Sequence, residues 1–410
     1  MKYVIIIPDG MADHPQPSLK GKTPLEIART PNMDQVALAG RVGLVETIPK
    51  DISPGSDVAN LSLLGYDPHV YYSGRAPLEA ASMGIELADA DWAIRCNLVT
   101  VFEGQMLDFA SGHIRSLEAR ILIDFLNREL GGKDVIFYPG VSYRHLVVIR
   151  GKDFAKLETI PPHDIIGKKF EKFLPRGRGS EFLIELMGKS AALLEDHEVN
   201  VVRRDLGENP ANMIWLWGQG RKPTFPTFQE KYGIKGAAIS AVDLIRGIAK
   251  YLGWDSIDVP GATGYYDTNY AGKGLAAVQA LDRYDLVYVH IEAPDEASHN
   301  GHLQEKITAI ENIDRHIVGP ILSALEARRE PYRLLVLPDH ATPIDTRTHS
   351  REPVPFALCG EGVDAARKFP FTEAGACSSD LFIESGMALM DYFLKARTLS
   401  GKAENSNSET

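Results

Sequence analysis

Four short apolar runs, each of strand length, constrain the fold of this chain more than any other feature. Most are rich in β-branched or aromatic residues and end near turn-forming or ionisable residues, as buried strands do. They occupy residues 3–7, 213–217, 286–290 and 334–337. Stretches with helical periodicity lie between them, notably at residues 237–252, 274–281 and 303–327. This alternation predicts an α/β fold with a mostly parallel sheet and helices on both faces.

One segment interrupts this rhythm and predicts a second, smaller domain. It has strands of its own at residues 95–102 and 145–149, a helix at 117–130, and a basic, glycine-rich exit around 168–179. We therefore expect an inserted α+β domain within a discontinuous larger one. The expected bounds are 1–86 and 185–396 for the larger domain, 87–184 for the insertion, and 397–410 for a flexible polar tail.

Composition excludes several classes of protein. A 410-residue chain with 44% hydrophobic residues can bury a substantial core, and its net charge of −11 disfavours binding to nucleic acid or to an anionic membrane. Neither a membrane-spanning run nor a signal-peptide core is evident in the sequence. The three cysteines, Cys96, Cys359 and Cys377, are too widely spaced for a disulfide framework or a cysteine zinc site. We expect a cytoplasmic protein of undetermined oligomeric state.

Metal-ligating side chains follow three of the four apolar runs. Asp9 follows the first run, Asp295 and His299 follow the third, and Asp339 and His340 follow the fourth. Ligands of open α/β sheets bind beyond the carboxyl ends of the strands. The spacing of Asp295 and His299 places both side chains on one face of a helix, which is suited to holding a single ion.

These residues, with His349, are sufficient for two ions, and their mixture of carboxylate and imidazole suits Zn²⁺ or Mn²⁺ better than Ca²⁺. For Asp9 alone, a helix cap is an equally good interpretation. For Asp295 with His299 and Asp339 with His340, recurrence at strand ends favours a metal site. Four neighbouring residues are left out of this prediction: His290, Glu292, His302 and Asp345.

Ser56 is the candidate nucleophile. It precedes a short helical stretch, residues 58–65, which a glycine closes. A helix start offers free N–H groups and the positive end of the dipole, which stabilise an anion such as a phosphoryl group. Taken alone, Ser56 is better explained as a helix cap. Beside two metal ions, which lower the pKa of a hydroxyl group, it becomes a nucleophile for phosphoryl transfer.

The motifs in combination resemble those of the cofactor-independent phosphoglycerate mutases, in particular the archaeal-type branch within the alkaline phosphatase superfamily. The similarity extends over nearly the whole chain except the tail. It rests on residues 8–10, 55–62, 65–68, 73–80, 95–97 and 261–264, on Asp295 with His299, and on Asp339 with His340.

This resemblance implies an alkaline-phosphatase-like fold and an isomerase of glycolysis and gluconeogenesis. It would interconvert 3-phosphoglycerate and 2-phosphoglycerate through a phosphoserine at Ser56, without bisphosphoglycerate, while the inserted domain closes over the substrate. One ion would be bound by Asp9, Ser56, Asp339 and His340, and the other by Asp295, His299 and His349, the metal being Mn²⁺, Zn²⁺, Co²⁺ or Mg²⁺. The candidate substrate contacts are Arg75, Arg95, Asn97, Arg144 and Lys273.

One departure from the family pattern keeps other functions open. Phe109 and Ala110 stand where the archaeal-type mutases place arginines, so the acceptor of the phosphoryl group could differ. A homoserine kinase-like phosphotransferase or a phosphatase would use the same site, although the chain has no Gly-x4-Gly-Lys-Ser/Thr loop. A catalytically silent, metal-binding sensor is the third alternative. The expected partner is a small phosphorylated metabolite.

Overall fold

The computed structural model describes residues 1–365 and 368–395. The chain forms two compact units, of which the first combines residues 1–72 with the chain from Pro226 onward. The second unit runs from Ser73 to Phe225, so the inserted segment extends beyond the expected bounds of 87–184 on both sides. The expected tail at 397–410 lies outside the described residues.

The first unit is built on an eight-stranded, mostly parallel sheet with the order β13-β2-β12-β11-β1-β10-β8-β9. Strand β1 lies between two parallel neighbours, β10 and β11, and β10 pairs in parallel with β8. Only β12 runs antiparallel to its neighbours, β11 and β2. The strands are β1 (Lys2–Pro8), β2 (Arg41–Val45), β8 (Gly236–Ile239), β9 (Asp255–Ser256), β10 (Leu286–Ile291), β11 (Tyr332–Val336), β12 (Val354–Gly360) and β13 (Phe382–Ile383).

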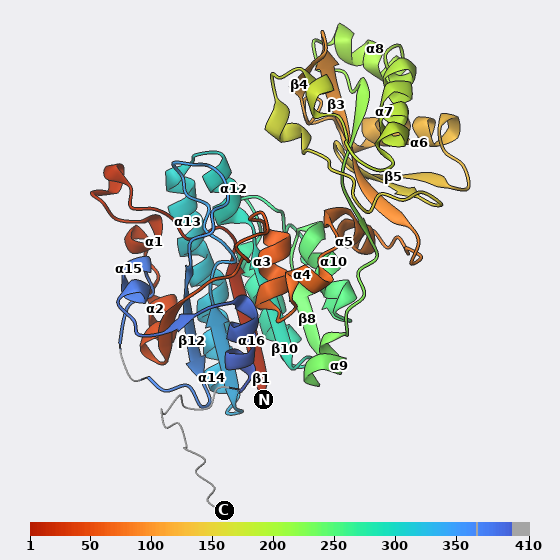
Figure 1. Ribbon diagram of the computed structural model, residues 1–410. Helices are drawn as coiled ribbons and strands as arrows, with labels where there is room; N and C mark the ends of the chain where they lie inside the picture. The colour runs from red at the N-terminus through yellow and green to blue at the C-terminus, as the bar shows by residue number, and fades with distance from the viewer. Residues whose placement is uncertain (366–367, 396–410) are drawn as a thin grey trace, which may run out of the picture. The chain divides into compact units, whose positions relative to one another are not determined.

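Helices cover both faces of this sheet (Figure 1). Because successive side chains of a strand point to opposite faces, Val4 and Ile6 join one core while Tyr3 faces the other way and packs edge-on against Phe393. The Val4 face is covered by α2 (Pro31–Leu38), α11 (Tyr270–Ala280), α13 (Leu303–Ile313) and α14 (Gly319–Ala327). The other face carries α3 (Ser56–Leu63), α10 (Asp243–Tyr251) and α16 (Gly386–Lys395).

Shorter elements connect these layers. A π-helical turn, Asp314–Val318, joins α13 to α14, so the predicted helical stretch 303–327 is confirmed as one continuous element. The remaining elements of this unit are a 3-10 turn (Pro17–Leu19), α1 (Pro24–Ile27), α4 (Pro68–Tyr71), α9 (Phe228–Tyr232), α12 (Ala293–His299) and α15 (Glu373–Cys377). Among the residues that the structure describes, no helix is long and apolar enough to cross a membrane.

One predicted helix is wrong at its start. Residues 237–252 were expected to be helical, but Gly236–Ile239 form strand β8 and the helix begins only at Asp243. The two alanines at 237 and 238 favour a helix locally, whereas pairing with β10 buries them in the sheet. Tertiary pairing therefore overrides local propensity here.

The second unit is built on an antiparallel five-stranded sheet. Its strands are β3 (Trp92–Phe102), β4 (Gln105–Asp108), β5 (Val135–Val141), β6 (Arg144–Ile149) and β7 (Met213–Arg221). Helices α6 (Ser116–Glu129), α7 (Ser180–Leu194) and α8 (Glu198–Asp205) pack against this sheet, and α5 (Arg75–Ser82) contacts β3 and β7. Two 3-10 turns, Pro162–Ile165 and Phe170–Phe173, complete it.

Strand β7 explains why the expected bounds were too narrow. The apolar run 213–217 was predicted to be a parallel strand of the larger sheet, but β7 pairs antiparallel with β3 of the second unit. An apolar run indicates a buried strand without indicating its partner or direction. Helices α5, α7 and α8 pack in the same unit, which places residues 73–86 and 185–225 with the insertion.

Candidate metal centre

The strand order of the first unit brings four distant segments to one edge of its sheet. Strands β11, β1 and β10 are adjacent and parallel, so their carboxyl ends meet at the same edge. Strand β2 also ends there, because two successive antiparallel pairings through β12 restore the direction of β11. The segments that leave this edge carry Asp9, Ser56, Asp339 and helix α12.

The first group of candidate ligands consists of Asp9, Asp339 and His340, all fully buried. The Nε2 atom of His340 lies 3.5 Å from Asp9 Oδ1 and 3.7 Å from Asp339 Oδ2. The hydroxyl oxygen of Ser56 lies 3.1 Å from the same Nε2 atom. The structure thus brings together the four residues predicted to share one ion.

The second group consists of Asp295, His299 and His349. The Nε2 atom of His299 lies 3.1 Å from Asp295 Oδ2, and that of His349 lies 3.5 Å from Asp295 Oδ1. Asp295 and His299 occupy one face of α12, as their spacing predicts. The rings of His340 and His349 are 4.1 Å apart between centroids, so the two groups are neighbours.

A third group contains two residues that the sequence prediction left out. His290 Nε2 lies 3.1 Å from Asp9 Oδ2, and its Nδ1 lies 3.9 Å from Glu292 Oε2. The ammonium group of Lys273 donates a hydrogen bond to the backbone oxygen of His290, at 3.3 Å, and attracts Glu292. Lys273, predicted as a substrate contact, is thus buried beside this group. The position of His290 and Glu292 at the end of β10 was the signal that could have identified them.

Buried negative charge dominates the electrostatics of the centre. Burial, followed by the charge of Asp339, raises the pKa of Asp9 well above its usual value, and burial raises the pKa of Glu292 to about 7. Among the described residues, neither carboxylate oxygen of Asp9 has a hydrogen bond of good geometry, and the nearest cationic partner is His290 Nε2, 3.1 Å from Oδ2. Buried charges are normally paired or bound to a metal. These oxygens fit divalent cations.

Histidines offset the burial of Asp295. Burial favours a higher pKa, but hydrogen bonds from His299 and His349 lower the pKa of Asp295 well below its usual value. Burial in turn lowers the pKa of His299, and the hydrogen bond and charge of Asp295 outweigh it and raise that pKa to about 9. In the metal-free protein, protonated His299 therefore balances part of the negative charge of Asp295 that a metal ion would otherwise balance.

Asn60 is a further residue of the centre that sequence reasoning did not single out. Its amide nitrogen donates to Asp339 Oδ2 at 2.8 Å and to the backbone oxygen of Ser56 at 2.7 Å. Its amide oxygen accepts a hydrogen bond from the Tyr288 hydroxyl. Asn60 therefore ties the start of α3, and with it Ser56, to a candidate ligand.

The other predicted substrate contacts lie in the second unit. Arg95, only 7% exposed, and Arg75 both donate from Nε to the carboxylate of Glu79, at 2.9 and 3.3 Å. The Arg95 guanidinium stacks on Trp217 at 4.1 Å, and the Trp217 indole donates to Asn97. Asn97 pairs in register with Arg144 of β6.

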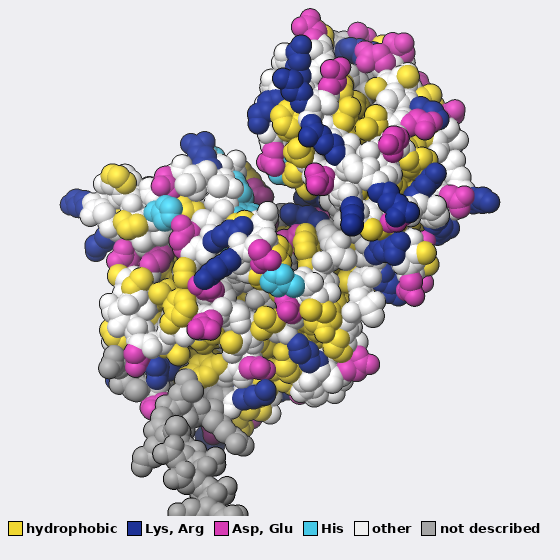
Figure 2. All heavy atoms as spheres, viewed as in Figure 1, with side chains coloured by type: hydrophobic (Ala, Val, Ile, Leu, Met, Phe, Trp, Pro, Cys, Tyr) yellow, Lys and Arg dark blue, Asp and Glu magenta, His cyan; other side chains and the backbone are white. Residues whose placement is uncertain are grey.

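Arg75 and Arg95 converge on the single carboxylate of Glu79. Burial is the main factor that lowers the pKa of Arg95, and the charges of Arg75 and Arg144 lower it further, against Glu79. Figure 2 shows Lys and Arg side chains interspersed with Asp and Glu on the visible face of this unit. A guanidinium group can hold a carboxylate or phosphate through two parallel hydrogen bonds.

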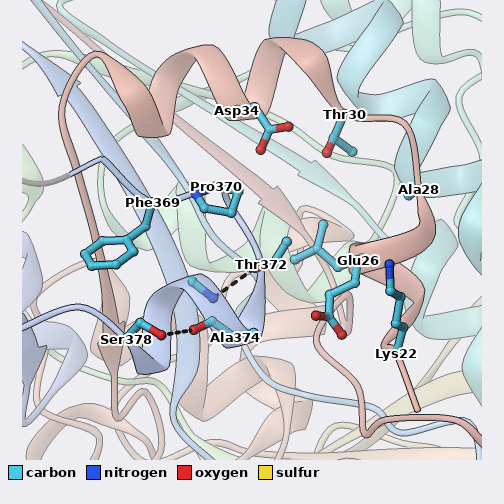
Figure 3. A pocket seen from close by; sticks show the side chains of 12 residues that line it. Lys22, Glu26, Ala28, Thr30, Asp34, Phe369, Pro370, Thr372, Ala374 and Ser378 are labelled. Atoms are coloured by element: carbon cyan, nitrogen blue, oxygen red, sulfur yellow. Dashed lines mark hydrogen bonds between the residues drawn. The ribbon is translucent and has the colours of Figure 1, made fainter. Parts of the chain in front are cut away.

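A shallow hollow of about 500 Å³ in the first unit is separate from the candidate metal ligands (Figure 3). Its wall includes Lys22, Glu26, Asp34 and Phe369, and no residue of the three groups lines it. Its charged side chains are of both signs, and no chemical class of ligand follows from them.

Comparison with known proteins decides the family. The family model described as 2,3-bisphosphoglycerate-independent phosphoglycerate mutase matches residues 37–200. A protein of that name from Methanosarcina barkeri is 52% identical over 398 residues, which cover 97% of this chain and 100% of the relative. The chain belongs to this family. The resemblance inferred from the motifs is thereby confirmed, and the homoserine kinase alternative is not favoured.

Solved structures of similar proteins confirm the fold. A protein from Pyrococcus horikoshii is 31% identical, with a TM-score of 0.82 and coverage of 98% of both chains. A cofactor-independent phosphoglycerate mutase from Thermoplasma acidophilum is 29% identical, with a TM-score of 0.65 over 96% of this chain and 99% of that one. The family and the clustered ligands together imply an enzyme that depends on divalent metal ions.

Proposed function

We propose that this enzyme interconverts 3-phosphoglycerate and 2-phosphoglycerate without bisphosphoglycerate, through a phosphoserine at Ser56. The observation that carries the proposal is the position of the Ser56 hydroxyl, at the first residue of α3 and 3.1 Å from His340 Nε2. The hydroxyl lies at the positive end of a helix and beside the Asp9, Asp339 and His340 group. This is a suitable position for a nucleophile that must carry a phosphoryl group.

The reaction has two displacements at phosphorus. In the first, the Ser56 hydroxyl loses its proton and its Oγ forms a bond to phosphorus while the bond to the 3-oxygen of the substrate breaks, and that oxygen gains a proton. In the second, the 2-hydroxyl of the retained glycerate loses its proton and attacks the phosphoserine, the bond from phosphorus to Ser56 Oγ breaks, and Ser56 regains a proton. Because the phosphoryl group only changes position, no nucleotide or bisphosphoglycerate is consumed. Excluding water protects the phosphoserine from hydrolysis.

Two divalent cations fit the side chains of the centre. We assign Asp9, Ser56, Asp339 and His340 to one ion and Asp295, His299 and His349 to the other, with Mn²⁺, Zn²⁺, Co²⁺ or Mg²⁺ as candidates. When bound, such ions supply positive charge that stabilises a serine alkoxide and the phosphoryl oxygens. The imidazole ligands favour the transition metals over Mg²⁺.

Two sets of cationic side chains are our candidates for holding the substrate. The arginines around Glu79, with Asn97, supply guanidinium groups that grip a carboxylate or phosphate through paired hydrogen bonds. Lys273 supplies a further positive charge beside Glu292, although burial lowers its pKa to about 8. We place the enzyme in the cytoplasm, in keeping with its three free cysteines. The proposed reaction would place it in glycolysis.

A metal-supplemented assay tests the proposal. Purified enzyme is stripped with a chelator, reloaded with Mn²⁺, and given 3-phosphoglycerate without bisphosphoglycerate. Formation of 2-phosphoglycerate supports the mutase. In parallel samples, phosphorylation of homoserine by ATP or release of inorganic phosphate as the main product contradicts it. Ser323→Ala, at an exposed serine of α14, serves as the control for Ser56→Ala.

A further inference from the structure

One buried hydroxyl group joins the two predicted ligand sets. Thr342 is fully buried two residues after His340, and its Oγ1 lies 2.5 Å from Asp295 Oδ1 and 3.2 Å from His340 Nδ1. Asp295 belongs to one ligand set and His340 to the other. Thr342 itself belongs to neither group. Its hydroxyl group therefore contacts one predicted ligand of each ion, Asp295 and His340.

The chemistry of these groups fixes the direction of both hydrogen bonds. A threonine hydroxyl has one proton and two lone pairs, and an ionised carboxylate only accepts. Thr342 therefore donates to Asp295, and its oxygen accepts from the Nδ1–H of His340. In that tautomer the lone pair of His340 is on Nε2, the atom that faces Ser56 Oγ at 3.1 Å and Asp9 Oδ1 at 3.5 Å.

Thr342 is itself held in place by the backbone and by a buried ammonium group. Its N–H donates to the backbone oxygen of Ala12 at 3.2 Å, and its carbonyl accepts from Lys306 Nζ at 3.0 Å. Lys306, fully buried in α13, also donates to Asp13 Oδ2 at 2.7 Å and to Ala12 at 3.4 Å. The Lys306 ammonium group thus holds the loop after β1 and the loop after β11 together through hydrogen bonds.

We propose that Thr342 is a positioning residue of the metal centre. Its hydroxyl orients Asp295 and holds His340 in the tautomer whose Nε2 is available to a cation. Residues that contact metal ligands in this way set ligand orientation and affinity, and their loss commonly weakens metal binding 10- to 100-fold. The inference rests on the proposed ligand sets and extends them to a residue that makes no metal bond.

Metal binding by three variants tests this role. Thr342→Val removes the hydroxyl at nearly constant shape, Thr342→Ser retains it, and Thr308→Val changes an exposed threonine of α13 as the matched control. Chelator-stripped proteins are titrated with Mn²⁺ in a calorimeter, without substrate. We expect about 10- to 100-fold weaker binding for Thr342→Val, and affinities near that of the unmodified enzyme for Thr342→Ser and Thr308→Val. Unchanged binding in Thr342→Val, or equal weakening in Thr342→Ser, overturns the proposal.

A second measurement does not depend on the folding of Thr342→Val. Nitrogen NMR of histidine-labelled, metal-free enzyme distinguishes the two neutral tautomers, and His340→Gln identifies the resonances of His340. We expect the proton of neutral His340 on Nδ1, and a proton on Nε2 overturns the proposal. Both measurements omit substrate, so an absence of mutase activity would count against the proposed function without deciding the role of Thr342.

Discussion

Asp9 shows how much a single side chain contributes to this site. Its carboxylate belongs to the group with Asp339 and His340 and also to the group with His290 and Glu292. It is fully buried, its oxygens have no hydrogen bond of good geometry among the described residues, and its nearest partners are the rings of His290 and His340. A buried carboxylate in this state is unfavourable unless a cation binds it. Metal binding and the stability of this edge of the sheet are therefore coupled.

Removing one carboxylate should weaken both metal binding and catalysis. Asp339→Ala deletes a candidate ligand and also leaves the Asn60 amide without one of its acceptors. We expect metal affinity to fall more than about 100-fold and the rate to fall with it, because losing a ligand weakens binding more than losing a residue that only contacts a ligand, such as Thr342. Metal content after dialysis, measured by elemental analysis, checks this. A variant with full metal content would refute the assignment of Asp339.

Metal binding should strengthen as the pH rises. In the metal-free enzyme the pKa of His299 is raised to about 9, so at neutral pH this ring carries a proton that a cation must displace. Protonation competes with the metal below pH 9, and the competition diminishes as pH approaches 9. Mn²⁺ titrations between pH 6.5 and 8.5 should show rising affinity with release of protons. An affinity that is flat or falls over this range contradicts the assignment.

Sequence reasoning found some residues of the site and missed others for a physical reason. Asp9 and Asp339 are polar residues directly beyond apolar runs, so their place at a strand end was visible. His290 and Glu292 stand at the end of strand β10, so their position was visible too, but His290 lies within the apolar run and was left out of the predicted ligands. Thr342 and Asn60 act through hydrogen bonds to ligands, and such contacts between distant segments have no local pattern.

At the scale of elements, the site depends on a close approach between the loop after β1 and helix α12. Gly10 adopts a φ of +62°, and a Cβ atom there would lie 2.6 Å from both Asp295 Oδ1 and Thr342 Oγ1. Only a residue without a side chain satisfies both the backbone conformation and the available space. Glycine at this position lets the two ligand-bearing segments meet.

A pair of glycine substitutions separates these two requirements. Gly10→Ala should destabilise the protein by about 2–5 kcal/mol, because backbone strain adds to an overpacked contact. Gly21→Ala is the matched control, since Gly21 has a φ of +81° with no atom within 4 Å of a Cβ, and it should cost about 1–2 kcal/mol. Chemical denaturation of the metal-free proteins measures both. Equal losses would show that the close approach is unimportant.

The secondary structure was more predictable than the pairing between elements. Strands β1, β10 and β11 and helices α11 and α13 follow from apolar periodicity, which local sequence encodes. Strand β7 was assigned to the wrong sheet because its partner, β3, lies more than a hundred residues earlier in the chain. Pairing partners depend on the whole fold, so the expected bounds of the second unit were too narrow.

For the whole molecule, strand order turns a scattered set of residues into one centre. Adjacent parallel strands β11, β1 and β10 bring together ligands that are about 300 residues apart in sequence, while β2 leads to Ser56. The net charge of −11 gives no general attraction for an anionic substrate. Local positive charge supplies it instead: the arginines around Glu79 in one unit, and the divalent cations that the carboxylate-rich centre of the other unit would hold.

Trapping the phosphorylated enzyme tests the central claim most directly. Metal-loaded enzyme is mixed with 3-phosphoglycerate, quenched in acid during turnover, digested and examined by mass spectrometry. The account predicts a phosphoryl group on the peptide that contains Ser56, and neither phosphorylation nor turnover in Ser56→Ala that is normally folded and assayed at saturating Mn²⁺. Full mutase activity in Ser56→Ala, or a phosphoryl group trapped on a different residue, would contradict it.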